Sequence, residues 1–211
     1  MKTRIFATVF LFTMIILPAE MQAQVRLGLQ GSVSLQTQAE IGELWNNCEL
    51  YPGYMFGGTV EYGLGRSFSL QTELNYQKKG EKVNTTFEGT EAVMKREFNY
   101  LTVPLLVKET VHDAGLGDKW DLTFFAGPYA SYLVSANATT TAGNSSDDQN
   151  IGDQTENSDF GALFGGGVRY NLSTGAAIYT ELRYEMGLSR IDKQDPDLRN
   201  KGIGITIGYR F

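Results

Sequence analysis

The end of the chain constrains the fold most, because residues 202–211 alternate between two kinds of side chain. Successive side chains of a strand point to opposite faces of the sheet. One face would be entirely large and apolar, with Ile203, Ile205, Ile207, Tyr209 and Phe211. The other face would carry glycines, a threonine and an arginine. Because about 9–11 residues let a tilted strand cross a bilayer, we predict that this segment closes a membrane barrel.

Seven earlier segments show the same alternation and would supply the other strands of the barrel. They lie at about residues 25–35, 54–64, 68–77, 97–109, 121–131, 160–170 and 178–186. Together with the last segment, they predict an all-β fold, an eight-stranded antiparallel up-and-down transmembrane β-barrel. A soluble, lipocalin-like barrel is the main structural alternative, and it would place the apolar faces inside.

The connections between these segments alternate between long and short along the chain. The long polar connections lie near residues 36–52, 79–96, 134–158 and 189–201, whereas Gly65-Arg66 and Leu172–Gly175 form tight turns. In an antiparallel barrel, odd and even connections lie at opposite rims. Outer-membrane barrels have short periplasmic turns and longer extracellular loops. We therefore expect the long loops to face outward and both ends of the mature chain to lie in the periplasm.

The first residues have the pattern of a secretory signal peptide. Lys2 and Arg4 precede an apolar run from Ile5 to Leu17, and the small residue Ala23 follows. We expect cleavage after Ala23, which leaves residues 24–211 as the barrel domain. The signal peptide would take the chain through the inner membrane, and we expect the barrel to reside in the cell outer membrane. The formal net charge of −6 gives no basic footprint for a nucleic acid, so we expect no nucleic-acid partner.

The predicted register places many charged side chains in the interior of the barrel. We expect a lumen charge network of Arg26, Glu61, Glu73, Arg169, Glu181, Arg183, Glu185 and Arg210, with Gln30, Asn75 and Lys108 beside it. An eight-stranded interior is about wide enough for side chains to fill, and unpaired buried charges are costly. The lumen is therefore predicted to be plugged by salt bridges. A proton or solute path along Glu181, Arg183 and Glu185 is the alternative.

Several segments also resemble the PorT-like outer-membrane β-barrel family. They are Tyr100–Lys108, Ala126–Tyr129, Gly165–Gly167 and Gly208–Phe211, and we take Tyr100, Pro104, Gly127, Pro128 and Phe211 as the motif residues. The resemblance covers essentially the whole mature chain and implies the barrel fold and an outer-membrane location. The founding member of the family is associated with protein secretion across the outer membrane. The resemblance carries over no catalytic residues.

Two motif residues have a physical interpretation. Pro104 lacks an N–H group, so we expect a bulge or weakened pairing there, with a lateral docking or opening site as the alternative. Phe211 fits an aromatic residue at the periplasmic interface. The resemblance also implies that barrel-insertion machinery reads this C-terminal aromatic residue.

The sequence offers little material for catalysis or metal binding. His112, beside Asp113, is the only histidine, and no serine at a fixed spacing completes a triad with it. Cys48 is the only cysteine, so it forms no internal disulfide, and we place it at the rim opposite His112. We interpret the acids of the long loop as a solvated surface rather than a calcium site: Asp147, Asp148, Asp153, Glu156 and Asp159. We expect no catalytic residues, metal or cofactor.

These features predict a non-enzymatic integral outer-membrane β-barrel with a plugged polar lumen that acts as a structural or interaction protein. The resemblance implies an accessory role in protein export across the outer membrane. The expected partners are outer-membrane lipid, the barrel-insertion machinery and a protein of the envelope. An outer-membrane enzyme acting on lipid or peptide and a small-solute channel are the alternative functions.

Overall fold

The computed structural model describes residues 25–39, 50–87, 90–112, 114–142, 145–191 and 198–211. The predicted signal peptide, Cys48 and Asp113 lie outside these ranges. None of the helical segments in the described ranges has both the length and the apolar character needed to cross a membrane.

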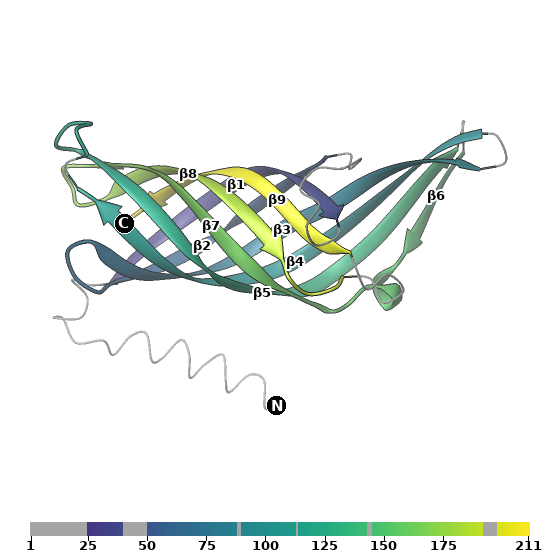
Figure 1. The fold of residues 1–211 in the computed structure, drawn as a ribbon, viewed down its shortest axis with the longest axis horizontal. Helices are drawn as coiled ribbons and strands as arrows, with labels where there is room; N and C mark the ends of the chain where they lie inside the picture. Colours follow the sequence, from purple (N-terminus) through teal and green to yellow (C-terminus); the bar gives the residue numbers. More distant parts are fainter. Residues whose placement is uncertain (1–24, 40–49, 88–89, 113, 143–144, 192–197) are drawn as a thin grey trace, which may run out of the picture.

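The described chain is almost entirely β-strand, and its strands form a closed, tilted barrel (Figure 1). The strands are β1 (Val25–Ala39), β2 (Tyr51–Gly63), β3 (Phe68–Phe87), β4 (Thr90–Val111), β5 (Trp120–Ala142), β6 (Ser145–Asn150), β7 (Ser158–Asn171), β8 (Ala177–Gly187) and β9 (Arg199–Arg210). A 3-10 turn, η2 (Gly152–Gln154), lies between β6 and β7.

Antiparallel pairing runs around the whole barrel and confirms the predicted fold. β9 pairs with both β8 and β1, and β4 pairs with β5 to complete the ring. The ninth strand, β6, does not enlarge the ring. It pairs with Asn137–Ala142 of β5, whereas Trp120–Tyr132 of β5 pair with β7. The closed ring therefore has eight strands. Beside the end of β5, β6 continues the position that β7 occupies along the rest of that strand.

The secondary structure predicted for two of the long connections was wrong, because parts of both are strands. Residues 79–87 and 90–98 continue β3 and β4 as one paired hairpin, and residues 134–142 continue β5. Hydrophilic residues can form strands when a neighbouring strand satisfies their backbone groups, and threonine-rich segments favour the extended conformation. We call the extension of residues 79–87, 90–98, 133–142 and 145–155 the outer wall. It projects from the end of the barrel opposite the C-terminus (Figure 1).

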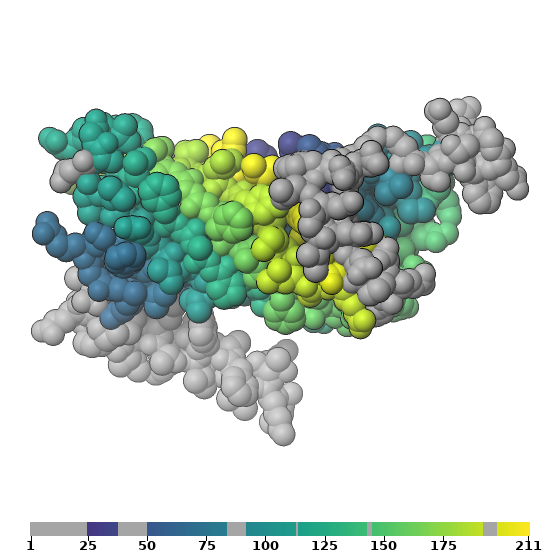
Figure 2. All heavy atoms as spheres, viewed as in Figure 1, coloured from purple at the N-terminus to yellow at the C-terminus, as the bar shows by residue number. Residues whose placement is uncertain are grey.

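The two faces of the strands point as the sequence predicted. On β9, Ile205 and Ile207 are 53% and 61% exposed, whereas Arg210 is only 7% exposed. The side chains of β5, β7, β8 and β9 form a continuous outer surface in the space-filling view (Figure 2). Apolar side chains therefore cover the outside of the barrel and charged side chains fill its inside, which excludes the lipocalin-like arrangement.

Aromatic residues gather on the outside near the short turns. Trp120 packs against Tyr170 with ring centroids 4.9 Å apart, and Tyr209 meets Phe211 edge-on at 5.2 Å. Phe211 is 61% exposed. This is the position of the aromatic girdle of an outer-membrane barrel.

The bulge expected at Pro104 is not there. The β4–β5 register continues unchanged through the pair of Pro104 with Tyr129, and the register shift lies at Asn99 and Tyr100. The pairing is weakened near Pro104 nonetheless. Within this described part of β4, Val103 and Pro104 form no ladder pair with β3, which agrees with the missing N–H group.

Candidate functional site in the barrel lumen

The centre of the lumen is held by Arg183 of β8. Its Nη1 and Nη2 atoms donate to the two carboxylate oxygens of Glu73 on β3, at 2.8 and 2.9 Å. Nη2 also donates to Glu181 at 2.8 Å, and the Nζ atom of Lys108 donates to Glu181 at 2.7 Å. Two cations and two carboxylates thus alternate across the barrel, and bidentate guanidinium–carboxylate pairs are among the stronger hydrogen-bonded contacts.

Neutral side chains complete the hydrogen bonding of this central group. The amide of Gln30 donates to Glu73 at 2.6 Å, and the amide of Asn75 donates to the same carboxylate at 2.7 Å. The carbonyl oxygen of Gln30 accepts bonds from Arg183 at 3.0 Å and from the Tyr179 hydroxyl at 3.2 Å. A buried ion pair is tolerated when its remaining donors and acceptors are satisfied in this way.

A second group lies at the base of the outer wall, around Lys79 of β3. Its ammonium group donates to Asp159 of β7 at 3.1 Å and to Glu185 of β8. It also lies 5.2 and 4.8 Å from the ring centroids of Tyr100 and Tyr129. The side chain of Lys79 is 1% exposed, so this cation is held entirely by carboxylates and aromatic faces.

A third group lies at the short-turn end. The Nε and Nη2 atoms of Arg169 donate to one oxygen of Asp121, at 3.2 and 2.8 Å, and the Asn171 amide donates to it at 2.6 Å. Glu61 lies between two arginines, with its Oε1 atom 3.5 Å from Arg26 and 3.8 Å from Arg210. These longer contacts form the loosest part of the lumen.

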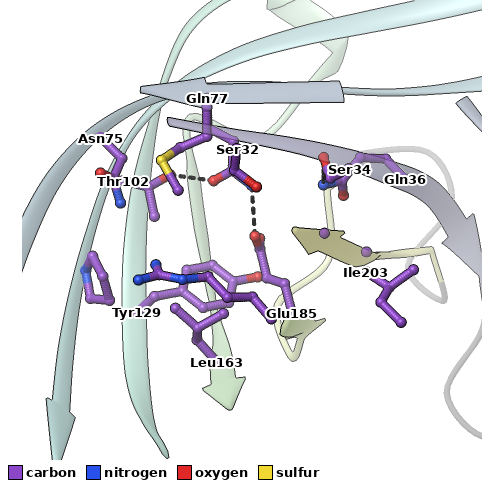
Figure 3. Close-up of a pocket in the computed structure, with 15 residues that line it drawn as sticks. Ser32, Ser34, Gln36, Asn75, Gln77, Thr102, Tyr129, Leu163, Glu185 and Ile203 are labelled. Atoms are coloured by element: carbon purple, nitrogen blue, oxygen red, sulfur yellow. Dashed lines mark hydrogen bonds between the residues drawn. The ribbon is translucent and has the colours of Figure 1, made fainter. Parts of the chain in front are cut away.

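Little space is left between the central group and the group around Lys79. A cavity of about 40 Å³ lies there, lined among others by Asn75, Arg183 and Glu185. Figure 3 shows Gln77 at its wall, bridging the Glu185 carboxylate at 2.7 Å and the Thr102 hydroxyl at 3.2 Å. A volume of this size holds a few water molecules at most.

A glycine allows an aromatic side chain to fill the lumen further. A Cβ atom at Gly208 would lie 2.1 Å from Cζ of Tyr179, so the Tyr179 ring lies directly against the β9 backbone. The Lys108 ammonium group is 5.1 Å from the same ring. The role of Gly208 is therefore to make room for the Tyr179 ring inside the barrel, and not to form a turn.

The structure brings together most of the predicted network. Seven of its eight members are buried: Glu61, Glu73, Arg169, Glu181, Arg183, Glu185 and Arg210. The eighth, Arg26, lies at the mouth of the barrel, where 43% of its side chain is exposed. The sequence did not assign Lys79 or Asp159 to the network, because both fell in segments interpreted as loops. Asn75, Gln77 and Lys79 are two residues apart, so Lys79 falls on the same, lumen-facing side of the strand. This alternation was the signal that could have found Lys79.

The motif residues lie on both sides of the barrel wall. Tyr100 is fully buried in the lumen, in an apolar cluster with Phe98, Leu133, Ala136 and Ile151. Pro104 is also buried, whereas Pro128 is exposed. A Cβ atom at Gly127 would meet the carbonyl oxygen of Leu105 at 2.0 Å. Gly127 thus permits a close approach of β5 to β4.

His112 is held in place by two structural contacts. Its Nδ1 atom lies 2.8 Å from Asp121, and its Nε2 atom lies 2.9 Å from the backbone carbonyl of Arg66. Both ring nitrogens are therefore engaged by groups other than a serine hydroxyl. The partner is Asp121 of the lumen, a residue that the sequence did not connect with His112.

The acids of the predicted long loop separate into two kinds. Asp147 and Asp148 lie on the exposed strand β6. Asp159 is fully buried and bound to Lys79, so its assignment to a solvated loop was wrong. In the residues that the structure covers, no three acids, histidines or cysteines are grouped as a metal site requires.

Comparison with solved structures gives matches at low identity and low TM-score. Ail of Yersinia pestis has 14% identity and a TM-score of 0.41, covering 89% of this chain and 99% of that one. Neisserial surface protein A has 10% identity and a TM-score of 0.47, covering 87% and 95%. OprG of Pseudomonas aeruginosa has 10% identity and a TM-score of 0.46, covering 89% and 96%. At this similarity, nothing about function follows.

The sequence comparisons are more specific about the family. The search of curated proteins gave no match. The family model described as outer membrane protein beta-barrel domain matches residues 16–193, which is most of the chain. The strands, the apolar exterior and the charged lumen of this protein agree with that description. The chain belongs to the outer membrane protein beta-barrel domain family.

Proposed function

We propose that this outer-membrane barrel is non-enzymatic, that its lumen is closed, and that it acts through contacts made by its outer wall. The observation that supports a closed lumen best is the pair of Arg183 and Glu73, which joins β8 to β3 through the centre of the barrel. Lys79 joins β3 to β7 and β8 in the same way at a second level. A solute would have to break the ion pairs of both Arg183 and Lys79 to pass through the lumen.

The outer wall supports an interaction function. β3, β4 and β5 have 20, 22 and 23 residues, whereas β8 has 11. About 9–11 residues cross the bilayer, so the longer strands extend well beyond it. All six residues of β6 are exposed, which makes this part of the wall accessible to a partner.

The finer role that we propose is an accessory function in protein export, as the resemblance to PorT-like proteins implies. The partner would be another protein of the envelope, and the C-terminal strand would be read by the barrel-insertion machinery. The cleaved signal peptide belongs to the same proposal, because a chain of this kind has to leave the cytoplasm first.

The test is co-purification from detergent-solubilised outer membranes after cross-linking in intact cells. The full-length protein is compared with a variant in which a short turn replaces residues 82–95, which removes the tip of the β3–β4 hairpin and leaves the lumen residues in place. We expect a defined envelope protein with the intact chain and its loss with the shortened one. Equal recovery with both variants, or none with either, would contradict a function of the outer wall.

A further inference from the structure

A second cavity lies inside the short-turn end of the barrel. It has a volume of about 190 Å³, and the residues of its wall that matter here are Arg26, Glu61, Arg66, Ser69, His112 and Arg169. This is several times the roughly 30 Å³ that one water molecule occupies in the liquid. The lumen is therefore packed in its middle but open at this mouth.

The charges around this cavity are unbalanced. Arg26, Arg66 and Arg169 line it, and Arg210 lies behind the wall, 3.8 Å from the Glu61 carboxylate that lines the cavity. Against these four guanidinium groups stand two carboxylates, those of Glu61 and of Asp121, the partner of Arg169. The central group, in contrast, has two cations for two carboxylates. The described groups named here thus carry an excess of two positive charges.

Unused hydrogen-bond donors gather at the same place. Arg169 binds Asp121 through Nε and Nη2, but its Nη1 atom has no partner, although the side chain is only 5% exposed. The Oγ atom of Ser69 and the Nε atom of Arg210 are buried without a hydrogen-bond partner as well, and the Nη1 atom of Arg210 has the 3.8 Å ion pair with Glu61 but no hydrogen bond. Buried donors normally have a partner, because leaving one unpaired costs free energy.

We propose that this cavity binds a small oxyanion, the phosphate or carboxylate group of a ligand, through Arg169, Ser69, Arg26 and Arg66. Guanidinium groups match the planar arrangement of such oxygens and bind them with charge-assisted hydrogen bonds. His112 fixes the wall of the site, because it joins the backbone of Arg66 to Asp121, which in turn orients Arg169. In outer-membrane barrels this rim faces the periplasm, so the ligand comes from that side.

Calorimetric titration of the full-length protein tests the proposal, in a neutral maltoside detergent free of phosphate. Inorganic phosphate and acetate are the probes, and we expect saturable binding at one site. Arg66→Gln and Arg26→Gln should each weaken binding about tenfold, the equivalent of one charge-assisted hydrogen bond. Arg169→Gln should abolish it. Arg190→Gln is the matched control, because Arg190 pairs with Glu156 at the other end of the barrel and is half-exposed.

A second arm separates a free anion from a lipid headgroup. Phosphatidylglycerol is added to the micelles in place of inorganic phosphate, and the same variants are titrated. Binding in the first arm identifies a free anion, and binding in the second arm alone identifies a headgroup as the source of the same chemistry. If Arg169→Gln fails to fold, Ser69→Ala and Arg66→Gln decide the question. Absence of binding in both arms, or binding that these variants leave unchanged, would overturn the proposal.

Discussion

Arg183 and Glu73 form a bidentate pair through the centre of the barrel, with N–O distances of 2.8 and 2.9 Å. They belong to β8 and β3, which are not neighbours in the sheet. The pair therefore ties opposite parts of the wall together, and both side chains are almost completely buried. This contact carries the proposal of a closed lumen.

Removing the cation alone should strongly destabilise the barrel. Arg183→Met leaves Glu73 and Glu181 short of a partner in the lumen, and breaking a buried ion pair costs about 3–5 kcal/mol. Urea unfolding in lipid vesicles measures the loss. The double variant with Glu73→Gln should recover part of it, since one unpaired carboxylate is gone. Arg190→Met, at an exposed ion pair, should cost no more than about 1 kcal/mol. Equal costs for Arg183→Met and Arg190→Met would contradict the prediction.

The outward face of β9 should behave as a lipid-facing surface. Ile207 is 61% exposed on that face. Ile207→Arg should lower the free energy of unfolding by about 2–4 kcal/mol if the residue lies near the bilayer midplane. Ile207→Leu is the control and should change little. Unfolding in vesicles measures both variants, and a tolerated arginine would show that this face does not contact hydrocarbon.

Gly208 should resist even a methyl group. Its Cβ atom would lie 2.1 Å from the Tyr179 ring, so Gly208→Ala should cost about 1–3 kcal/mol by overpacking. Tyr179→Leu in the same chain should remove most of the penalty. Gly31→Ala provides the comparison, because the nearest atom to a Cβ there is 3.7 Å away. The thermal midpoints of these three variants and of the wild-type protein give the answer, and a penalty that Tyr179→Leu leaves intact would refute the packing argument.

The sequence predicted the barrel well because its signal is local. Alternation along β9, for example, requires only that successive side chains face opposite sides. The sequence predicted the lengths of the strands poorly. Lys79 and Asp159 lie in hydrophilic segments without an apolar face, and such segments look like loops until their backbone partners are known. The contact of Arg183 with Glu73 was also beyond the sequence, since it depends on the shear of the closed barrel rather than on spacing along the chain.

The two rims should lie on opposite sides of the membrane. In a Cys48→Ser background, Asp148→Cys places a thiol on the exposed strand β6, and Ser173→Cys places one in the turn between β7 and β8. A membrane-impermeant maleimide should label position 148 on intact cells and position 173 only after the outer membrane is permeabilised. Labelling in the opposite order would invert the topology.

The central claim, that buried ion pairs close the lumen, is tested most directly by recording current from the purified protein in planar bilayers. The wild-type protein should insert without a steady conductance, because the levels of Arg183 and Lys79 leave no continuous water path between the rims. A steady open current from the wild-type protein would contradict this account.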